Sequence, residues 1–357
     1  MNWPLVKLGD LCIVKRGTTI TQKEAIEGKV PVVGGGLKPT YFHNSPNRNG
    51  NTITVSGSGA SAGFINFYKE PIFASDCSTV EPKNDNVNVR YIYRAMQNLQ
   101  EYIYTKLKAG AAQPHVYAKD LANLEIQLPP LAEQQRIAEL LDKADLILQL
   151  REQSIAKLDA LAQSVFANMF LGGNWTSKYL KQLGTVKTGG TPSSTKNGMF
   201  GTDIPFITPG DLQSKSQPKR YLSLEGAAES VVVKKGSALV CCIGATIGKM
   251  DKAKTDSAFN QQLNAVEWGN EINEDYGIFA LLKIKNKIVN SGIATTLPIL
   301  KKSLFEKLEI EVPPINLQTE FSQYIAAIEE QKKRCVRQLE AARVMTRSLQ
   351  SQSFATN

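Results

Sequence analysis

Residues 128–137 read Leu-Pro-Pro-Leu-Ala-Glu-Gln-Gln-Arg-Ile, and this stretch opens a helical pattern near the middle of the chain. Pro129 and Pro130 cannot lie inside a helix, because proline lacks a backbone N–H, but they fit its first turn. Apolar residues then recur at steps of three and four, the spacing of one helix face. Gly172-Gly173 ends the pattern. The sequence therefore predicts one long helix over residues 131–172.

Residues 1–130 contain short apolar runs separated by Gly, Asn and Ser, a pattern typical of strands joined by tight loops. One helix is predicted from Asn88 to about Lys108, where apolar residues fall at helical spacing. This region is therefore expected to mix α and β structure. The predicted strands are Val6–Arg16, Asn51–Ser56, Gly63–Phe67, Glu70–Phe73 and Leu124–Leu128.

The second half of the chain repeats the first. One set of positions recurs at a constant offset of 184 residues, and a glycine-bounded loop and a tyrosine recur at an offset of 185. The openings match more loosely, as Trp3 and Leu8-Gly9 with Trp175 and Leu183-Gly184. The closer matches are Pro114, Leu121, Leu124, Glu125, Ile126, Pro129 and Pro130 with Pro298, Phe305, Leu308, Glu309, Ile310, Pro313 and Pro314, then Gly59–Gly63 with Gly244–Gly248, and Tyr91 with Tyr276.

This period is too long for a solenoid and indicates duplication of a domain together with its helix. A second helical stripe runs from Leu317 to Leu349. Each helix would be roughly 60 Å long at 1.5 Å per residue, so we expect the two to bury their stripes against each other. The alternative is that each helix packs on its own domain. The expected fold class is α+β: two mixed α/β domains related by pseudo-two-fold symmetry, at 1–130 and 173–314, with an antiparallel coiled coil of helices at 131–172 and 315–357.

Composition narrows the function further. The chain has 357 residues, a net charge of +9 and a pI near 9.1, which favours nucleic acid or another anionic partner. Its five cysteines are scattered without a metal-binding spacing, as expected in a reducing compartment. The N-terminus shows no signal-peptide pattern and no stretch is apolar enough to span a membrane, so a cytoplasmic location is predicted.

The sequence resembles the specificity (S) subunit of type I restriction-modification systems. The resemblance covers the whole chain and is carried by residues 128–137, by the weaker copy Val-Pro-Pro-Ile-Asn-Leu-Gln-Thr-Glu-Phe at 312–321, and by the Trp…Leu-Gly openings of both halves. The copy departs from the first stretch at Leu317, which stands where the first has Glu133. Gln318 keeps the place of Gln134.

The resemblance implies two target recognition domains, each reading one half of a split, asymmetric site on double-stranded DNA, with the helices as a spacer. It implies two modification (methyltransferase) subunits that bind S-adenosylmethionine and methylate adenine. It also implies restriction and motor subunits that join for cleavage. No cofactor and no catalysis are expected on this chain itself.

The residues are consistent with a chain that does no chemistry. A Ser-His-Asp or Cys-His site would have to use one of the two histidines, His43 and His115, with nothing nearby to recommend it, so both are expected to be structural. Gly57–Gly63 resembles a dinucleotide loop with a wrong last spacing, and a turn between strands is preferred. No Asn-Pro-Pro-Tyr methyltransferase motif is present. Two other classes stay open: an enzyme such as a fused methyltransferase or nuclease, and a protein-binding scaffold.

DNA readers present cations to phosphates, and amides, hydroxyls or Arg to base edges. Each candidate is also compatible with an ordinary solvated turn. The candidate DNA-binding residues are Lys15, Arg16, Thr18, Lys38, Arg48, Ser58, Lys187, Thr191, Lys215, Lys249, Gln261 and Gln262. The candidate partner-binding residues at the helix starts are Glu133, Gln134, Gln135 and Gln318, for which helix initiation is the competing role.

Overall fold

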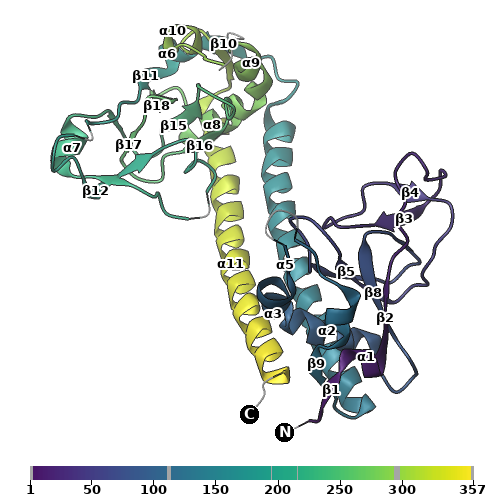
Figure 1. The fold of residues 1–357 in the computed structure, drawn as a ribbon. Helices are drawn as coiled ribbons and strands as arrows, with labels where there is room; N and C mark the ends of the chain where they lie inside the picture. Colours follow the sequence, from purple (N-terminus) through teal and green to yellow (C-terminus); the bar gives the residue numbers. More distant parts are fainter. Residues whose placement is uncertain (1–2, 111–113, 194, 215, 293–297, 355–357) are drawn as a thin grey trace. The chain divides into compact units, whose positions relative to one another are not determined.

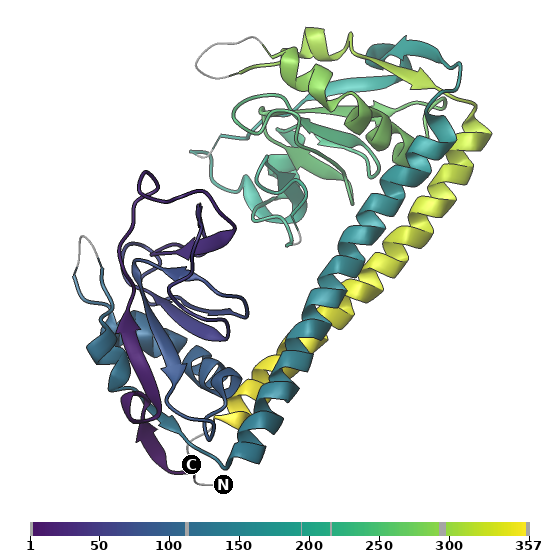
Figure 2. The same cartoon turned by 90° about the vertical axis from the view of Figure 1, so that its right-hand side faces the viewer.

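The computed structural model describes residues 3–110, 114–193, 195–214, 216–292 and 298–354 (Figures 1 and 2). The chain divides into two compact units, and each is described by itself. Unit 1 holds residues 1–153 and 336–357, and unit 2 holds residues 154–335. Both long helices therefore contribute one end to each unit.

Unit 1 contains a four-stranded antiparallel sheet in the order β2-β8-β5-β6. A second sheet has the order β4-β3-β7, with β3 and β7 parallel, and β1 pairs with β9 near the start of the long helix. The elements in chain order are β1 (Leu5–Lys7), α1 (Leu8–Leu11), β2 (Cys12–Arg16), β3 (Val30–Val33), β4 (Phe42–His43), β5 (Thr52–Ser56), β6 (Ile65–Tyr68), β7 (Phe73–Ala74), β8 (Cys77–Pro82), α2 (Val89–Asn98), α3 (Gln100–Tyr102), the π-helical turn η1 (Ile103–Leu107), α4 (Ala118–Ala122), β9 (Glu125–Gln127) and α5 (Leu131–Phe170).

The strand predicted at Val6–Arg16 is wrong as a single element, because the helical turn α1 interrupts it. Leu8 is fully buried there, and its N–H donates to the carbonyl oxygen of Leu124 at 2.7 Å. The prediction at Glu70–Phe73 is displaced, since the strand β7 begins at Phe73. Strand β8 was not predicted, because four successive residues are buried and no alternation of apolar and polar residues marks it.

The helix predicted from Asn88 to about Lys108 is present but broken. The Asn88 side chain caps α2 by accepting from the N–H of Tyr91 at 3.0 Å. Leu99 then leaves helical geometry (φ −92°, ψ 7°), and α3 and the π-helical turn follow. The apolar spacing of the sequence is retained across this break, so the pattern could not reveal it.

Unit 2 repeats the topology of unit 1. Its sheets have the orders β11-β18-β15-β16 and β13-β12-β17-β14, and β10 pairs with β19. Strands β12 and β17 are parallel, as are β3 and β7 in unit 1. The elements are β10 (Thr176–Tyr179), α6 (Leu180–Leu183), β11 (Gly184–Thr188), β12 (Phe200–Ile207), β13 (Tyr221–Leu222), α7 (Leu224–Ala228), β14 (Val232–Val233), β15 (Ala238–Cys241), β16 (Met250–Lys252), β17 (Ser257–Phe259), β18 (Leu263–Trp268), α8 (Glu274–Lys283), α9 (Lys285–Asn290), α10 (Lys302–Phe305), β19 (Glu309–Val312) and α11 (Ile315–Ser353).

The two long helices, α5 and α11, pack together in both units. In unit 1 the start of α5 shares a core with Leu349 near the end of α11, and Glu152 pairs with Arg343 at 2.9 Å. In unit 2 Phe166 of α5 lies 5.6 Å from Phe321 of α11, ring centroid to ring centroid. The helices run antiparallel within each unit, as the apolar stripes predicted. Each helix also begins against its own domain, so the alternative packing describes part of the observed contact.

In the described residues, no helix combines the length and the apolar composition needed to span a membrane. The long helices are amphipathic instead. Each has buried apolar residues on one face and charged residues on the others.

Candidate nucleic-acid interface

In the first domain, several loops meet where strands β2, β3 and β5 end and β8 begins. The N–H of Gly17 donates to Cys77 O at 2.8 Å, and the N–H of Gly57 donates to Asp76 O at 3.0 Å. The N–H of Ser75 donates to Val33 O at 2.7 Å. We call residues 16–18, 34–36, 56–58 and 75–77 the first sheet-end cluster.

The second domain builds the same arrangement where β11, β12 and β15 end and β18 begins. The N–H of Gly189 donates to Leu263 O at 3.1 Å, and the N–H of Cys242 donates to Gln262 O at 2.9 Å. The N–H of Asn260 donates to Ile207 O at 3.0 Å. We call residues 188–190, 208–210, 241–243 and 260–263 the second sheet-end cluster. Matching these backbone bonds pairs Arg16 with Thr188, Ser58 with Ile243, and Asp76 with Gln262. Ser75 then pairs with Asn260 and Cys77 with Leu263, so the second cluster has one residue more in this segment.

A glycine is required at one matched position of each cluster. A Cβ added to Gly17 would lie 2.2 Å from Ser75 O, and one added to Gly189 would lie 2.2 Å from Asn260 O. Both distances are far inside van der Waals contact. These glycines let two backbone segments approach closely, so the loops are held by the backbone, and their side chains are not needed to position them.

The first sheet-end cluster gathers three polar side chains. The hydroxyl of Ser58 donates a short hydrogen bond to Oδ2 of Asp76. A guanidinium nitrogen of Arg16 lies 3.9 Å from Oδ1 of the same carboxylate. The Arg16 side chain is 71% exposed and that of Asp76 is 34% exposed. The cluster thus presents an exposed cation beside a partly exposed acceptor, the chemistry used to read base edges.

The other predicted DNA-binding residues of the first domain differ in availability. Lys15, Thr18 and Lys38 are exposed. Arg48 is part of the framework, because its guanidinium donates to Thr79 Oγ1 at 2.9 Å and pairs with Glu81 at 3.2 Å. Its side chain is 15% exposed. Arg48 also donates to Arg16 O at 3.2 Å, so it ties its loop to strand β8 and to the backbone of the first sheet-end cluster.

In the second domain, Thr191 and Gln261 lie together, with the threonine hydroxyl donating to Gln261 Oε1 at 2.7 Å. Gln262 accepts from the Asn260 side-chain amide at 2.9 Å, and this pair belongs to the second sheet-end cluster. The exposed Gln261 and the half-buried Gln262 can both offer amide groups to a ligand.

Two of the lysines predicted in the second domain, Lys187 and Lys249, make different contacts within it. Lys187 pairs with Glu267 at 2.7 Å along the paired strands β11 and β18. Lys249 donates to Pro209 O at 3.1 Å. Lys215 lies outside the described residues. Lys187 is therefore neutralised by a neighbouring carboxylate, which weakens its attraction for phosphate.

The glycine-bounded loops are tight turns between strands, as expected. The N–H of Gly63 donates to Ser56 O at 2.8 Å, and the N–H of Gly248 donates to Cys241 O at 2.8 Å. Gly59, Gly63, Gly244 and Gly248 all have positive φ angles, between 77° and 95°. Left-handed backbone favours glycine, so the repeated spacing of the loop follows from its turn geometry.

The two histidines occupy structural positions. His43 is buried, and its Nδ1 accepts from the N–H of Ile26 at 3.0 Å. The backbone of His115 forms an isolated bridge with Ser58, and its N–H donates to Ala109 O at 2.8 Å. His115 thus fixes a loop that borders the first sheet-end cluster.

Two of the predicted partner-binding residues face the protein interior. Gln134 is 1% exposed and Gln318 is 0% exposed. The Gln134 amide nitrogen donates to Pro129 O at 2.9 Å, and that of Gln318 donates to Pro313 O at 2.7 Å. The structure corrects the prediction that Gln134 and Gln318 contact a partner directly, because their side-chain polar atoms bond to the chain's own backbone. The contacts of both glutamines are those of a helix joint, which was the competing role.

Glu133 and Gln135 lie at the surface of the α5 start. The Glu133 carboxylate accepts from Arg136 at 2.7 and 2.8 Å, and these hydrogen bonds lower its pKa. Gln135 is exposed. The structure therefore keeps these two side chains available to a partner.

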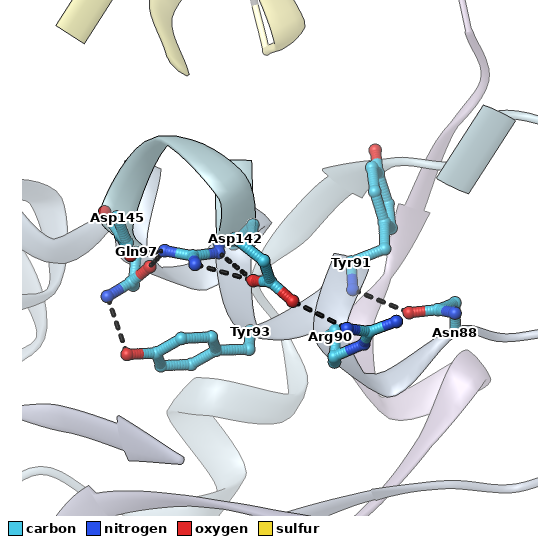
Figure 3. A network of polar contacts seen from close by, with 8 residues as sticks. Asn88, Arg90, Tyr91, Tyr93, Gln97, Asp142 and Asp145 are labelled. Atoms are coloured by element: carbon cyan, nitrogen blue, oxygen red, sulfur yellow. Dashed lines mark hydrogen bonds and ion pairs between the residues drawn. The ribbon is translucent and has the colours of Figure 1, made fainter. Parts of the chain in front are cut away.

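Beyond the joint, α2 is fixed to α5 by an ion-pair network (Figure 3). Arg94 contacts Asp142 at 2.6 Å and Asp145 at 2.5 Å, and Arg90 contacts Asp142 at 2.7 Å. Burial alone would lower the pKa of Arg94, but the hydrogen bonds to the two carboxylates raise it. The network holds the first domain firmly against the start of the long helix.

The helix pair of unit 1 carries several exposed apolar residues, which are candidates for contact with another protein. Ile147 is 49% exposed on α5, and Val344 and Met345 are 66% and 64% exposed on α11. Leu146 and Leu150 add exposed apolar area on α5. Such residues on an amphipathic helix pair are typical of a surface that another protein covers.

Asp76 is a candidate site residue that sequence reasoning missed. It follows an unpredicted break between β7 and β8, and its partners Arg16 and Ser58 lie on other loops. A lone aspartate in a turn carries no signal of such a neighbourhood. The duplication could have pointed to it, because Asp76 precedes the strand that matches β18.

Comparisons with known proteins cover most of the chain. Residues 1–160 and 172–340 each match the family described as type I restriction modification DNA specificity domain. The MjaVIII type I restriction enzyme specificity subunit of Methanocaldococcus jannaschii is 25% identical over 191 residues, 51% of this chain and 45% of that protein. The MjaX specificity subunit of the same organism, a putative one, is 22% identical over 70% of this chain and 64% of that protein. The matched segments thus span about half to two thirds of these relatives.

Solved structures share the fold. The S subunit of a type I restriction-modification system from M. genitalium superposes with a TM-score of 0.69 at 19% identity, covering 100% of this chain and 97% of that one. A chain from a study of complex assembly and conformational transition of the type I R-M system gives a TM-score of 0.60 at 15% identity, covering 99% and 97%.

Proposed function

We propose that this chain, which belongs to the type I restriction-modification DNA specificity family, reads a bipartite site on double-stranded DNA, one half-site with each domain. The observation that carries this proposal is the repeated sheet-end cluster. The same backbone bonds recur in both domains, while Arg16, Ser58 and Asp76 in one are replaced by Thr188, Ile243 and Gln262 in the other. A shared framework with different side chains suits two related readers of different sequences.

The charge of the chain supports DNA as the ligand. Its net charge of +9 would attract a polyanion. Arg16 is an exposed cation of the first sheet-end cluster, and the exposed Lys15 and Lys38 lie within two residues of that cluster in the sequence. Phosphate contacts position a protein on the duplex without specifying sequence, whereas amides, hydroxyls and Arg read base edges. Both kinds of group are present in each domain.

The long helices would serve assembly and spacing. Under this proposal the helix pair determines the number of base pairs between the half-sites and binds two modification subunits. The exposed apolar residues Ile147, Val344 and Met345, together with Glu133 and Gln135, support such a docking role. S-adenosylmethionine would be bound by those partners, which would methylate adenine, and restriction and motor subunits would join them in the cytoplasm. This chain would act as a specificity subunit without catalysis of its own.

The test is a selection with the assembled complex. The chain and its modification subunits are incubated with a random duplex pool, and bound duplexes are sequenced at two salt concentrations. We expect a bipartite, asymmetric consensus with a fixed spacer and with affinity that falls steeply as salt rises. Recovery of no consensus would refute the proposal. Methyl transfer or cleavage by the purified chain alone would instead identify it as an enzyme.

A further inference from the structure

The first sheet-end cluster differs from the second in one chemical respect. It holds a guanidinium, on Arg16, next to a carboxylate, on Asp76. At the matched positions the second domain has Thr188, whose hydroxyl donates to Asn264 Oδ1 at 2.7 Å, and Gln262. Of the two matched clusters, only the first therefore has an arginine side chain beside a carboxylate.

The Asp76 carboxylate is held in place by its neighbours and is partly exposed. Its Oδ2 accepts from Ser58, which fixes the orientation of the group. Its Oδ1 faces Arg16 at 3.9 Å. A carboxylate has about four acceptor positions, so Ser58 and Arg16 do not exhaust it.

Two glycines keep this carboxylate accessible. A Cβ on Gly35 would lie 3.2 Å from Asp76 Oδ2 and 3.2 Å from Ser58 Oγ. A Cβ on Gly57 would lie 3.0 Å from Asp76 Oδ1. Any larger residue at Gly35 or Gly57 would crowd the Asp76 and Ser58 side chains. The two glycines therefore leave space for the Asp76 carboxylate and for a ligand group beside it.

Among the cations predicted to bind DNA in the first domain, Arg16 best fits base reading. Arg48 is committed to Thr79 and Glu81, and a lysine cannot donate in the paired, planar way that guanine O6 and N7 require. The Arg16 side chain is 71% exposed, and its planar group has five N–H donors. Asp76 can accept from one edge of the guanidinium while the other edge faces the DNA.

From these contacts we infer that Arg16 reads a guanine in the first half-site and that Asp76 is the positioning residue that orients Arg16, with Ser58 holding Asp76. This inference rests on the proposed function. It assigns the chemical identity of one base pair, which the proposed function leaves open. It also states that the second domain does not read a guanine from the matched position.

The experiment compares Arg16→Lys, Asp76→Asn and Ser58→Ala in the assembled complex with its modification subunits. Each variant is tested against the selected duplex and against duplexes changed at one base pair at a time. Arg16→Lys keeps the positive charge but removes the two parallel N–H donors of the guanidinium. Discrimination at one G·C pair of the first half-site should therefore fall by about 5- to 150-fold, the range of one bidentate base contact. Asp76→Asn should relax the same base pair, and Ser58→Ala should relax it by less. The second half-site should be read as before in all three.

Lys7→Ala is the control. Lys7 is exposed on strand β1, where it pairs with Glu125 of β9, and it is not part of the first sheet-end cluster. Its loss removes one positive charge and is expected to leave the base preferences of both half-sites unchanged.

Several results would overturn the inference. If Arg16→Lys keeps every base preference, Arg16 contacts phosphate. If Asp76→Asn relaxes a base pair other than the one Arg16 controls, Asp76 reads DNA itself. If Asp76→Asn abolishes binding to all duplexes while Ser58→Ala leaves the profile unchanged, Asp76 supports the fold. Failure of the wild-type complex to select any bipartite site would instead refute the proposed function, so the two failures are distinguishable.

Discussion

Gln134 on α5 accepts a 2.9 Å hydrogen bond from the backbone N–H of Asn88, the residue that caps α2, although 46 residues separate the two. Gln318 on α11 makes the same contact with Asn273 at 2.8 Å. Tyr91 and Tyr276 complete the joint by donating to Gln127 O and Glu311 O, each at 2.7 Å. The same two contacts therefore recur at both joints, and the glutamine contact ties each domain to the helix that follows it.

Replacing Gln134 with Ala should destabilise the chain. The substitution leaves the N–H of Asn88 and the carbonyl of Pro129 without their partner in a buried site, which costs roughly 1–3 kcal/mol in free energy of unfolding. Urea denaturation of the purified chain measures it. Gln135→Ala is the control, because Gln135 is exposed, and it should change the value by less than about 0.5 kcal/mol. Equal losses of stability in the two variants would show that the buried Gln134 contacts do not stabilise the joint between the first domain and α5.

Arg94→Met should also destabilise unit 1. The side chain of Arg94 is 10% exposed and contacts two carboxylates, Asp142 and Asp145, which would be left close together without their main cation. We expect a loss of roughly 1.5–3 kcal/mol in the free energy of unfolding. Arg136→Met removes an exposed ion pair with Glu133 and should cost at most about 1 kcal/mol. Thermal unfolding of the two variants side by side provides the comparison, and a larger loss in Arg136→Met would argue against the network.

The adjacent glycines Gly189 and Gly190 offer a matched pair of substitutions. A Cβ on Gly189 would lie 2.2 Å from Asn260 O, whereas one on Gly190 meets nothing within 4 Å. Gly189→Ala should therefore displace the loops of the second sheet-end cluster and weaken reading of one half-site. Gly190→Ala should leave it intact. Selection from a random duplex pool with the assembled complex measures both, and normal reading by Gly189→Ala would show that the cluster is not the DNA contact.

The exposed apolar residues of the helix pair should matter for assembly and little for stability. Ile147→Ser combined with Met345→Ser should lower affinity for the modification subunits at least tenfold, because interface centres depend on buried apolar contacts. The free energy of unfolding of the chain alone should change by less than about 1 kcal/mol, since both side chains are already exposed. Gln149→Ser, at an exposed polar position of α5, is the control. Co-purification at controlled concentrations measures assembly. Unchanged affinity in the double variant would show that the modification subunits do not bind at Ile147 and Met345.

The sequence predicted those features that depend on regular spacing. The stripes of α5 and α11 and the offset between the halves are local or periodic signals, and the structure has both helices and the duplicated sheets. The turn at Gly59–Gly63 was predictable because left-handed backbone requires glycine at defined positions. The break in the helix at Leu99 was not predictable, because the apolar residues keep their helical spacing through it.

The site was less predictable, because its contacts join residues distant in the chain. Lys187 and Glu267 are 80 residues apart, and Arg48 and Thr79 are 31 apart, so the sequence could not show that these cations are engaged. Burial of Gln134 depends on the loop before α2, which the stripe of α5 does not reveal. Residue type alone therefore identified the polar loops but not the side chains within them that stay available.

The duplication extends to the last turn of each long helix. Phe170, at the end of α5, lies 4.8 Å from the ring of Tyr276, and Phe354, just after α11, lies 5.7 Å from the ring of Tyr91. Each domain core is thus closed by the helix that starts in the other repeat. A chain carrying one repeat would leave that core open, and a second copy of the same repeat would supply the missing helix end by exchange. The smallest self-sufficient form of this architecture is therefore two repeats, whether they are joined in one polypeptide or contributed by two.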